Sequence, residues 1–472
     1  MNWTEALIWS AGRSLILAII GTVIANGLQT WLRGLSGAKK KRAWGGLLLP
    51  FFVPSLMTGY CYRDTAMSLI HFPWAKEILY GLIVMMQAVP VAVIILEFSS
   101  SPATSATALY SGGLMKLAST ERWKLFLTSR FQYSLAAFCL LFVLSFQEAD
   151  LAALMQASGW TEWMFTKHVG GLALQETISL TLWPILIQIP FLVPIVLWLG
   201  KAGDRNFNII ERSTLSQPGR DWFCTAWLSL AIAIVVIVPG SQLIRGIFIG
   251  FGSLFLQPST FRELSDALLI AGTTTVGTLG LAVACRFFLI QNGSSAGRWL
   301  LFCLLIPGSM GNLALGLMLA GIFQTEPFQI AYDTPVPLVL GEILAILPRT
   351  LILLHCLSRM NFPASEYLVE MLKSSPDVRQ RDQAIELAWQ TQGRIRFITV
   401  AIVGFWAYFE VMLPSILAMP GLAPVGLVLY NNLHYGRIAA LGAKLALAFM
   451  FPFLIALGVL QLRKLWSRLL LN

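Results

Sequence analysis

The sequence predicts an all-α polytopic membrane protein with about eleven transmembrane helices in two halves related by a parallel repeat. Three observations lead to this class: the composition, the apolar stretches and an internal repeat. Of the 472 residues, 57% are hydrophobic and 12% are charged, and the mean hydropathy is +0.72. Because a soluble domain carries roughly 25% charged residues, this balance is typical of a chain embedded in a bilayer.

Apolar stretches of spanning length recur along the whole chain. A helix needs roughly 20 mostly apolar residues to cross the hydrocarbon layer. Prolines inside such a stretch are tolerated, because neighbouring helices can satisfy the freed backbone groups. The stretches that we expect to span are 11–32, 44–62, 77–97, 132–149, 181–200, 224–245, 264–291, 299–323, 337–357, 396–418 and 441–462.

The distribution of basic residues predicts the orientation. If the basic segment 33–42 faces the cytoplasm, alternate loops hold about 23 Lys and Arg inside against about 6 outside. The N-terminus is then outside and the C-terminus cytoplasmic, and the expected location is the inner membrane of a bacterium. This asymmetry accounts for the net charge of +10 by membrane topology, so we expect membrane lipid and no nucleic acid as a partner.

An internal repeat divides the chain into two halves. Three short stretches recur in the same order at offsets of about 250 to 265 residues, which is typical of a duplication. The predicted domains are residues 1–205, with about five helices, and 206–472, with about six. Span 11–32 pairs with span 264–291, and both run from outside to inside in the predicted orientation. The repeat is therefore parallel. The matched residues are Pro54 with Pro307, Pro90 with Pro348, and Glu148 with Glu410.

The densest run of charge, residues 366–389, lies in a cytoplasmic loop between two apolar stretches. A mixed-charge helix with an apolar side at Leu368, Met371 and Leu372 can dock in a groove by that side and fix its register by charge. The alternative is an ordinary solvated face, which is what charge runs usually form. The charged residues are Glu366, Glu370, Lys373, Asp377, Arg379, Arg381, Asp382 and Glu386.

Three stretches carry a resemblance to a known family. They are "LPFFVPSLMTGY" (49–60), "LLIPGSMGNLALGL" (304–317) and "LPRTLILLHCL" (347–357). Together with the paired cytoplasmic loops, 98–131 and 358–395, they resemble the permease subunit of binding-protein-dependent ABC importers, in the fused form of the ferric-iron class. The resemblance implies a type I importer fold, ATPase subunits in two copies, a periplasmic solute-binding protein, and a small solute such as ferric iron.

The resemblance also implies which residues dock the ATPase. The family's cytoplasmic loop has the pattern EAA-x3-G-x9-I-x-LP. The first copy here has no acidic residue in that place, and the second has proline in place of the glycine. The matching positions, with two arginines of the second loop, are Thr107, Ala108 and Gly113 in the first copy and Glu370, Met371, Leu372, Pro376, Arg379 and Arg381 in the second.

Four of the repeat residues are candidates for the translocation path: Pro54, Pro307, Glu148 and Glu410. Charge at membrane depth is costly and usually faces a bundle interior or a cavity. The alternative is that the two glutamates lie in headgroup water or pair with Lys444 or Arg437. A second function stays open as well, an ion-coupled secondary transporter in which Glu148, Glu342 or Glu410 carries protons.

Motifs for catalysis are not found in the sequence. Gly200-Lys201 lacks the upstream glycine and the following hydroxyl of a phosphate-binding loop, so ATP hydrolysis is expected on a separate chain and this chain is not expected to be an enzyme. His71, His168 and His434 fall on the predicted outer side, but no ligand spacing links them. We therefore expect neither a metal site nor a cofactor, and the cysteines form no CxxC pair.

Overall fold

The computed structural model describes residues 2–99, 119–200, 218–254, 259–290, 295–360, 363–434 and 441–469. Within these ranges all regular secondary structure is helical and no strand occurs. Seven helical stretches of the described residues are long and apolar enough to cross a membrane. The chain is thus an all-helical membrane-embedded protein, which confirms the predicted class. The seven stretches are α1 (Trp3–Gly34), α4 (Pro73–Phe98), α9 (Leu174–Leu199), Asp221–Gly250, Ser259–Leu289, Val336–Ser358 and Leu441–Arg463.

Four of the predicted spans are interrupted or short in the structure. Stretch 44–62 divides into α2 (Gly37–Leu48), η1 (Pro50–Phe52) and α3 (Ser55–Ser68), because Pro50 and Pro54 interrupt the helix. Stretch 299–323 is a pair of helices bent by 100°. That pair is α13 (Ser295–Ser309) with α14 (Asn312–Phe323). Of the remaining two stretches, 132–149 contains the short apolar part Tyr133–Phe146 of α6 (Ser119–Phe146), and 396–418 divides into α18 (Arg394–Tyr408) and α19 (Met412–Leu417). The count of about eleven spans therefore stays a prediction.

The chain forms two compact units, each built from two chain segments. Unit 1 comprises Met1–Pro239 and Ala284–Gly321, and unit 2 comprises Gly240–Val283 and Ile322–Asn472. The predicted halves, 1–205 and 206–472, describe the sequence repeat and stay a prediction.

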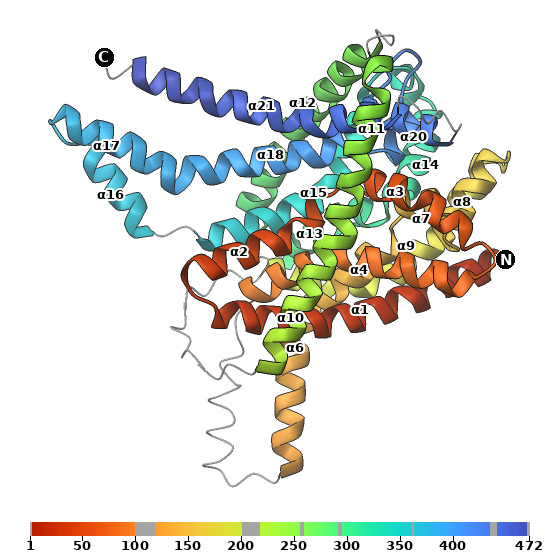
Figure 1. Cartoon of the computed structure of the whole chain (residues 1–472), viewed down its shortest axis with the longest axis horizontal. Helices are drawn as coiled ribbons and strands as arrows, with labels where there is room; N and C mark the ends of the chain where they lie inside the picture. The colour runs from red at the N-terminus through yellow and green to blue at the C-terminus, as the bar shows by residue number, and fades with distance from the viewer. Residues whose placement is uncertain are drawn as a thin grey trace. The chain divides into compact units, whose positions relative to one another are not determined.

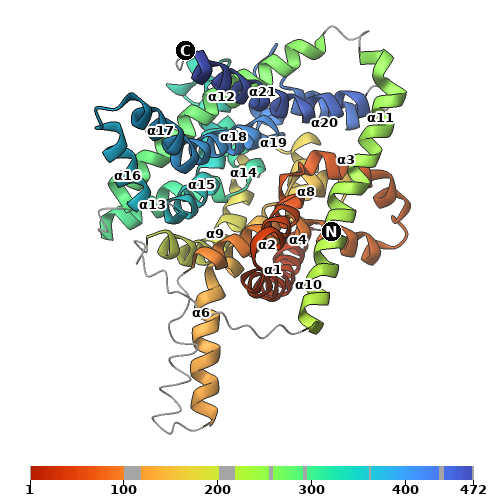
Figure 2. The same cartoon turned by 60° about the vertical axis from the view of Figure 1, so that its left-hand side comes forward.

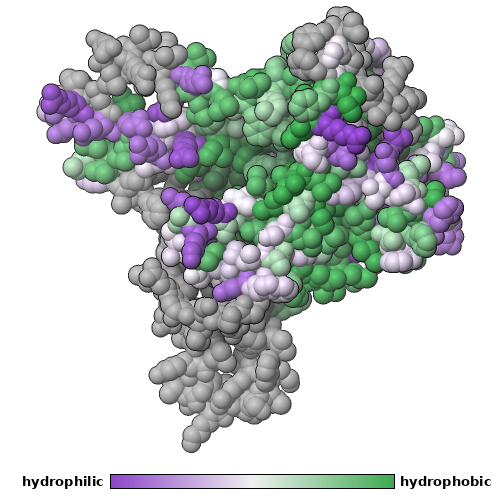
Figure 3. All heavy atoms as spheres, viewed as in Figure 1, coloured by the Kyte–Doolittle hydropathy of each residue, from purple (hydrophilic) through white to green (hydrophobic). Residues whose placement is uncertain are grey.

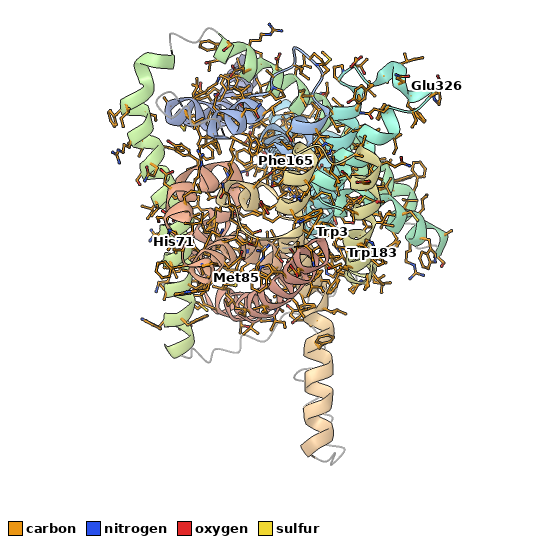
Figure 4. The ribbon with its side chains drawn as sticks, turned by 90° about the vertical axis from the view of Figure 1, so that its right-hand side faces the viewer. Trp3, His71, Met85, Phe165, Trp183 and Glu326 are labelled. Carbon is orange, nitrogen blue, oxygen red and sulfur yellow. The ribbon has the colours of Figure 1, made fainter. Side chains whose placement is uncertain are left out.

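Unit 1 is a bundle in which α1 packs against α4 and α6, α6 packs against α9, and α9 packs against α13 (Figure 1). Helices α7 (Asp150–Met155) and α8 (Trp160–Val169) follow α6, and α10 (Pro218–Ala231) crosses α1. The indole of Trp160 is fully buried and donates to the Phe146 carbonyl at 2.7 Å. At the start of α1, the ring of Trp3 lies 5.1 Å from that of Trp163 (Figure 4). Aromatic side chains thus hold the short helix α8 in unit 1.

Unit 2 is built from α15 (Val336–Met360), α18, α19, α20 (Val425–His434), α21 (Leu441–Leu469), most of α11 (Val238–Leu254) and most of α12 (Ser259–Cys285). Helices α11 and α21 cross closely, and a Cβ on Gly246 would lie 2.7 Å from the Gly442 Cα. A buried ion pair joins Lys444 of α21 to Glu263 of α12. Between α15 and α18 the chain forms α16 (Pro363–Lys373) and α17 (Val378–Ala388), which pack on each other as a hairpin (Figure 2).

Candidate functional site: a helical hairpin and two helix breaks

The α16–α17 hairpin contains the charged run singled out in the sequence. Its tight turn is stabilised locally: the Asp377 carboxylate caps α17 by accepting from the Arg379 backbone N–H at 2.9 Å. The Ser375 hydroxyl accepts from the Asp377 N–H at 3.2 Å. Asp is a strong N-cap residue because its short side chain reaches the free N–H groups of the first turn. The sequence therefore ends one helix and starts the next within a few residues.

One side of the hairpin is packed and the other is left open. Val369 and Ala384 are buried between the two helices. Tyr367, Met371 and Ile385 are 69%, 57% and 61% exposed. Of the predicted apolar side, Leu368 and Met371 are exposed, whereas Leu372 is half-buried. We call Tyr367, Leu368, Met371 and Ile385 the apolar face of the hairpin; the exposed residues around it are Glu370, Pro376, Arg379 and Arg381.

The base of the hairpin is fastened to α21. The Arg463 guanidinium lies 3.5 Å from the centre of the Trp389 ring and donates to Glu386 at 3.3 Å. Trp389 begins a π-helical turn, η5 (Trp389–Gly393), that joins α17 to α18. A Cβ at Gly393 would lie 2.4 Å from the Trp389 ring, so this turn requires glycine. The hairpin and α18 thus form one continuous helical path.

The first predicted docking loop is not part of this geometry. Thr107, Ala108 and Gly113 lie outside the described residues, and their role stays a prediction.

Glu148 lies in the break between α6 and α7. Its Oε1 accepts from the Leu151 N–H at 2.7 Å, so the side chain caps a helix of six residues. Its backbone carbonyl accepts from the Thr161 hydroxyl of α8 at 3.0 Å. The loop that follows is held by α1, because the Ser10 hydroxyl accepts from the Trp160 N–H at 2.9 Å. Glu148 thereby fixes where the long helix ends and the short one begins.

Glu410 has the same local geometry in unit 2. It lies in the break between α18 and α19, is 7% exposed, and its Oε1 accepts from the Leu413 N–H at 3.4 Å. Helix α19 also has six residues, and α8 and α20, which follow the two short helices, have ten each. The loop before α20 is held by α12 through Arg262, which donates to the Gly421 carbonyl at 3.2 Å. Lys444, one predicted partner of Glu410, pairs with Glu263, and Arg437 lies outside the described residues.

The two prolines of the predicted path lie at helix interruptions or close to them. Pro54 is the N-cap of α3. Pro307 lies inside α13, close to its end at Ser309. The bend between α13 and α14 contains Gly311 at φ +89°, where a Cβ would lie 3.1 Å from the Gln147 Cβ. In unit 1 the bend is thus packed on the residue that precedes Glu148, a contact that sequence reasoning missed because nothing local signals it.

Another carboxylate of unit 2 is buried within a candidate membrane span. Glu342 of α15 is 1% exposed, and Oε2 accepts from the Thr274 hydroxyl of α12 at 2.8 Å. It interacts electrostatically with Glu410. Acidic residues in such positions commonly mark ion or substrate pathways. Sequence reasoning named Glu342 from its place in an apolar stretch but had no means to pair it with Thr274.

The described ranges contain no group of three or more His, Cys, Asp or Glu side chains that could hold a metal ion. His71 is exposed in the turn before α4 (Figure 4). His168 lies at the end of α8, where burial lowers the pKa of its imidazole. The side chain of His434 lies outside the described part of the structure.

Comparisons of the chain with known protein families, with curated proteins and with solved structures find no match. The fold and the site alone define the class: an all-helical membrane-embedded protein whose unit 2 carries a projecting helical hairpin with an exposed apolar face (Figure 1).

Proposed function

We propose that the chain is the permease subunit of an ATP-driven importer of the ABC class, and that the α16–α17 hairpin docks a separate ATPase. One observation carries the proposal: the hairpin exposes Tyr367, Leu368, Met371 and Ile385, and its described charged residues are exposed as well. Apolar side chains on one face of a helix, flanked by charges, suit insertion into a partner's groove. The charges then fix register and exclude wrong partners.

The continuous path from the hairpin into unit 2 supports a coupling role. Helix α17, the η5 turn and α18 run without a helical interruption from Val378 to Tyr408. At 1.5 Å per residue this path is about 45 Å long. It ends at the break that contains Glu410. Movement of the hairpin by a closing ATPase pair would therefore be transmitted to the Glu410 break, a candidate gate.

The likeness of the two breaks supports the finer architecture. A long helix, a glutamate that caps a six-residue helix, and a ten-residue helix occur in this order around Glu148 and again around Glu410. This is what a parallel duplication would leave behind. We include in the proposal two halves with about eleven spans and a path lined by Glu148, Glu410, Pro54 and Pro307.

The remaining parts of the proposal come from the sequence resemblance and the charge distribution. The solute is small, with ferric iron the substrate that the resemblance favours, and a periplasmic solute-binding protein delivers it. Two ATPase copies bind the cytoplasmic loops. The chain lies in a bacterial inner membrane with its N-terminus outside and its C-terminus in the cytoplasm.

A specific observation favours a second candidate function, an ion-coupled secondary transporter. Glu342 is buried within a candidate membrane span, against Thr274 and close to Glu410. Buried carboxylates of this kind carry protons in many transporters. In that case the chain would transport alone, and transport would collapse with the ion gradient.

Copurification with hairpin variants tests the leading proposal. Leu368→Asp with Met371→Asp places two charges on the apolar face. Each apolar side chain withheld from a groove weakens binding by roughly 1.5–3 kcal/mol, so the ATPase should be lost by about 100-fold or more. The control is Ile330→Asp, since Ile330 is also an exposed apolar residue, at 91%. Retention of the ATPase by the hairpin variant would overturn the proposal.

A further inference from the structure

The short helix α2 directly follows the first long helix and carries an unusual concentration of cations. Only Leu35 and Ser36 separate it from α1, which ends at Gly34. Its sequence, GAKKKRAWGGLL, contains Lys39, Lys40, Lys41 and Arg42, which we call the basic quartet. Lys39, Lys41 and Arg42 are exposed and Lys40 is half-buried. Figure 3 shows this part of unit 1 as a hydrophilic patch, where Figure 1 draws α2.

Among the residues that the structure describes, no acidic side chain pairs with the quartet. Arg33, nearby in α1, in contrast pairs with Glu97 at 2.9 Å. The first turn of α2 has no acidic residue, and no side chain caps the helix. Cations near a helix N-terminus are also repelled by the positive end of the helix dipole. The isolated chain therefore bears an unfavourable concentration of positive charge here.

The rest of α2 is fixed to unit 1, so the quartet is held in place. Ala43 and Leu47 are buried. A Cβ at Gly46 would lie 3.2 Å from Ile232 and 3.4 Å from Leu228, so the helix approaches this neighbouring segment closely. The packed residues and the cations occupy different parts of a helix of twelve residues. Because α2 follows a span-length helix by two residues, we expect its cations at the level of lipid headgroups.

We propose that the basic quartet binds the phosphate headgroups of anionic phospholipids, so that α2 is an interfacial anchor. Charge complementarity identifies the occupant, since basic clusters beside a membrane span attract anionic lipid surfaces. Bound lipid stabilises α2 and hence the segment that leads into the Pro50–Pro54 interruption. This inference does not depend on the proposed transport function.

Native mass spectrometry of the purified full-length chain, titrated with POPG or POPC in detergent, tests the site. The variant replaces the whole quartet with glutamine. Each cation near an anionic headgroup contributes roughly fivefold in affinity, so removal of all four should lower POPG affinity by roughly 600-fold while POPC binding stays unchanged. A second variant, with the three lysines replaced by arginine, should bind POPG as the wild type does.

The control variant removes the same amount of charge from unit 2: Lys373→Gln, Arg379→Gln, Arg381→Gln and Arg396→Gln, all at exposed positions. It should keep POPG affinity within about twofold. Equal losses in both glutamine variants would mean that net charge alone attracts the lipid, and full POPG binding by the quartet variant would show that the cations serve something else. Either result overturns the proposal. A quartet variant that keeps POPG but loses a copurifying ATPase would assign the quartet to that protein instead.

Discussion

Breaking the ion pair between Arg13 and Glu77 should destabilise unit 1 strongly. The Arg13 Nη1 lies 2.7 Å from the Glu77 Oε2, and the two side chains are 10% and 13% exposed. The pair also holds the loop before α8: Arg13 donates to the Ser158 carbonyl at 2.7 Å, and Glu77 accepts from the Ser158 N–H at 3.0 Å. The guanidinium lies 4.5 Å from the centre of the Tyr80 ring. Arg13→Met would leave a carboxylate without its partner in a largely buried place.

Arg13→Met or Glu77→Met should each lower the free energy of unfolding by about 3–5 kcal/mol, because each leaves an uncompensated charge. The double variant removes both charges, so its loss should fall short of the sum by about 2 kcal/mol. Part of the loss remains, since the Ser158 backbone groups stay without those partners. The control is Lys76→Met, whose exposed ammonium donates to the Gln156 carbonyl at 2.7 Å and should contribute under about 1 kcal/mol.

Unfolding of the purified chain by denaturant in detergent, followed by tryptophan fluorescence, measures these free energies. Four proteins complete the cycle: the wild type, the two single variants and the double variant. Single-variant losses below about 1 kcal/mol, or losses that simply add, would refute the view that this pair is a buried clamp.

Three further predictions concern single positions. Gly311→Ala should cost roughly 1–3 kcal/mol in unfolding free energy, because φ is +89° and the added Cβ meets the end of α6; Gly12→Ala, which meets nothing within 4 Å, should not destabilise. Arg463→Met should speed hydrogen exchange in the η5 turn by freeing Trp389, and unchanged exchange would disprove the clamp at the hairpin base. The pKa of His168 is lowered by burial, so the unfolded state binds the proton more readily and stability should fall as the pH drops below about 6.5; melting curves from pH 7.5 to 5 should show a shallower fall for His168→Gln.

The class of the fold could be predicted because hydropathy summed over many residues is insensitive to local detail. α1, α4 and α9 are found close to the expected stretches. The same insensitivity explains why the interruptions of the predicted spans could not be predicted from hydropathy. A stretch such as 299–323 stays apolar whether or not Gly311 adopts a left-handed conformation and bends the chain by 100°.

The candidate site was predictable only where the signal was local. The apolar side of 366–389 could be seen from the helical spacing of Leu368 and Met371, both of which the structure leaves exposed. The contact between Glu342 and Thr274 joins residues 68 positions apart, and the Arg13–Glu77 pair joins residues 64 apart. Such pairs depend on how helices pack, which a single sequence does not specify.

The most direct test of the central claim is to purify the tagged wild-type chain in mild detergent from its native cell. Copurifying proteins would be identified and counted by mass spectrometry, and the sample would be assayed for ATP hydrolysis. Our account predicts two copies of an ATPase per chain, with hydrolysis that disappears in the Leu368→Asp, Met371→Asp variant. A chain that purifies without a nucleotide-binding partner, yet transports in liposomes with an ion gradient alone, would contradict it.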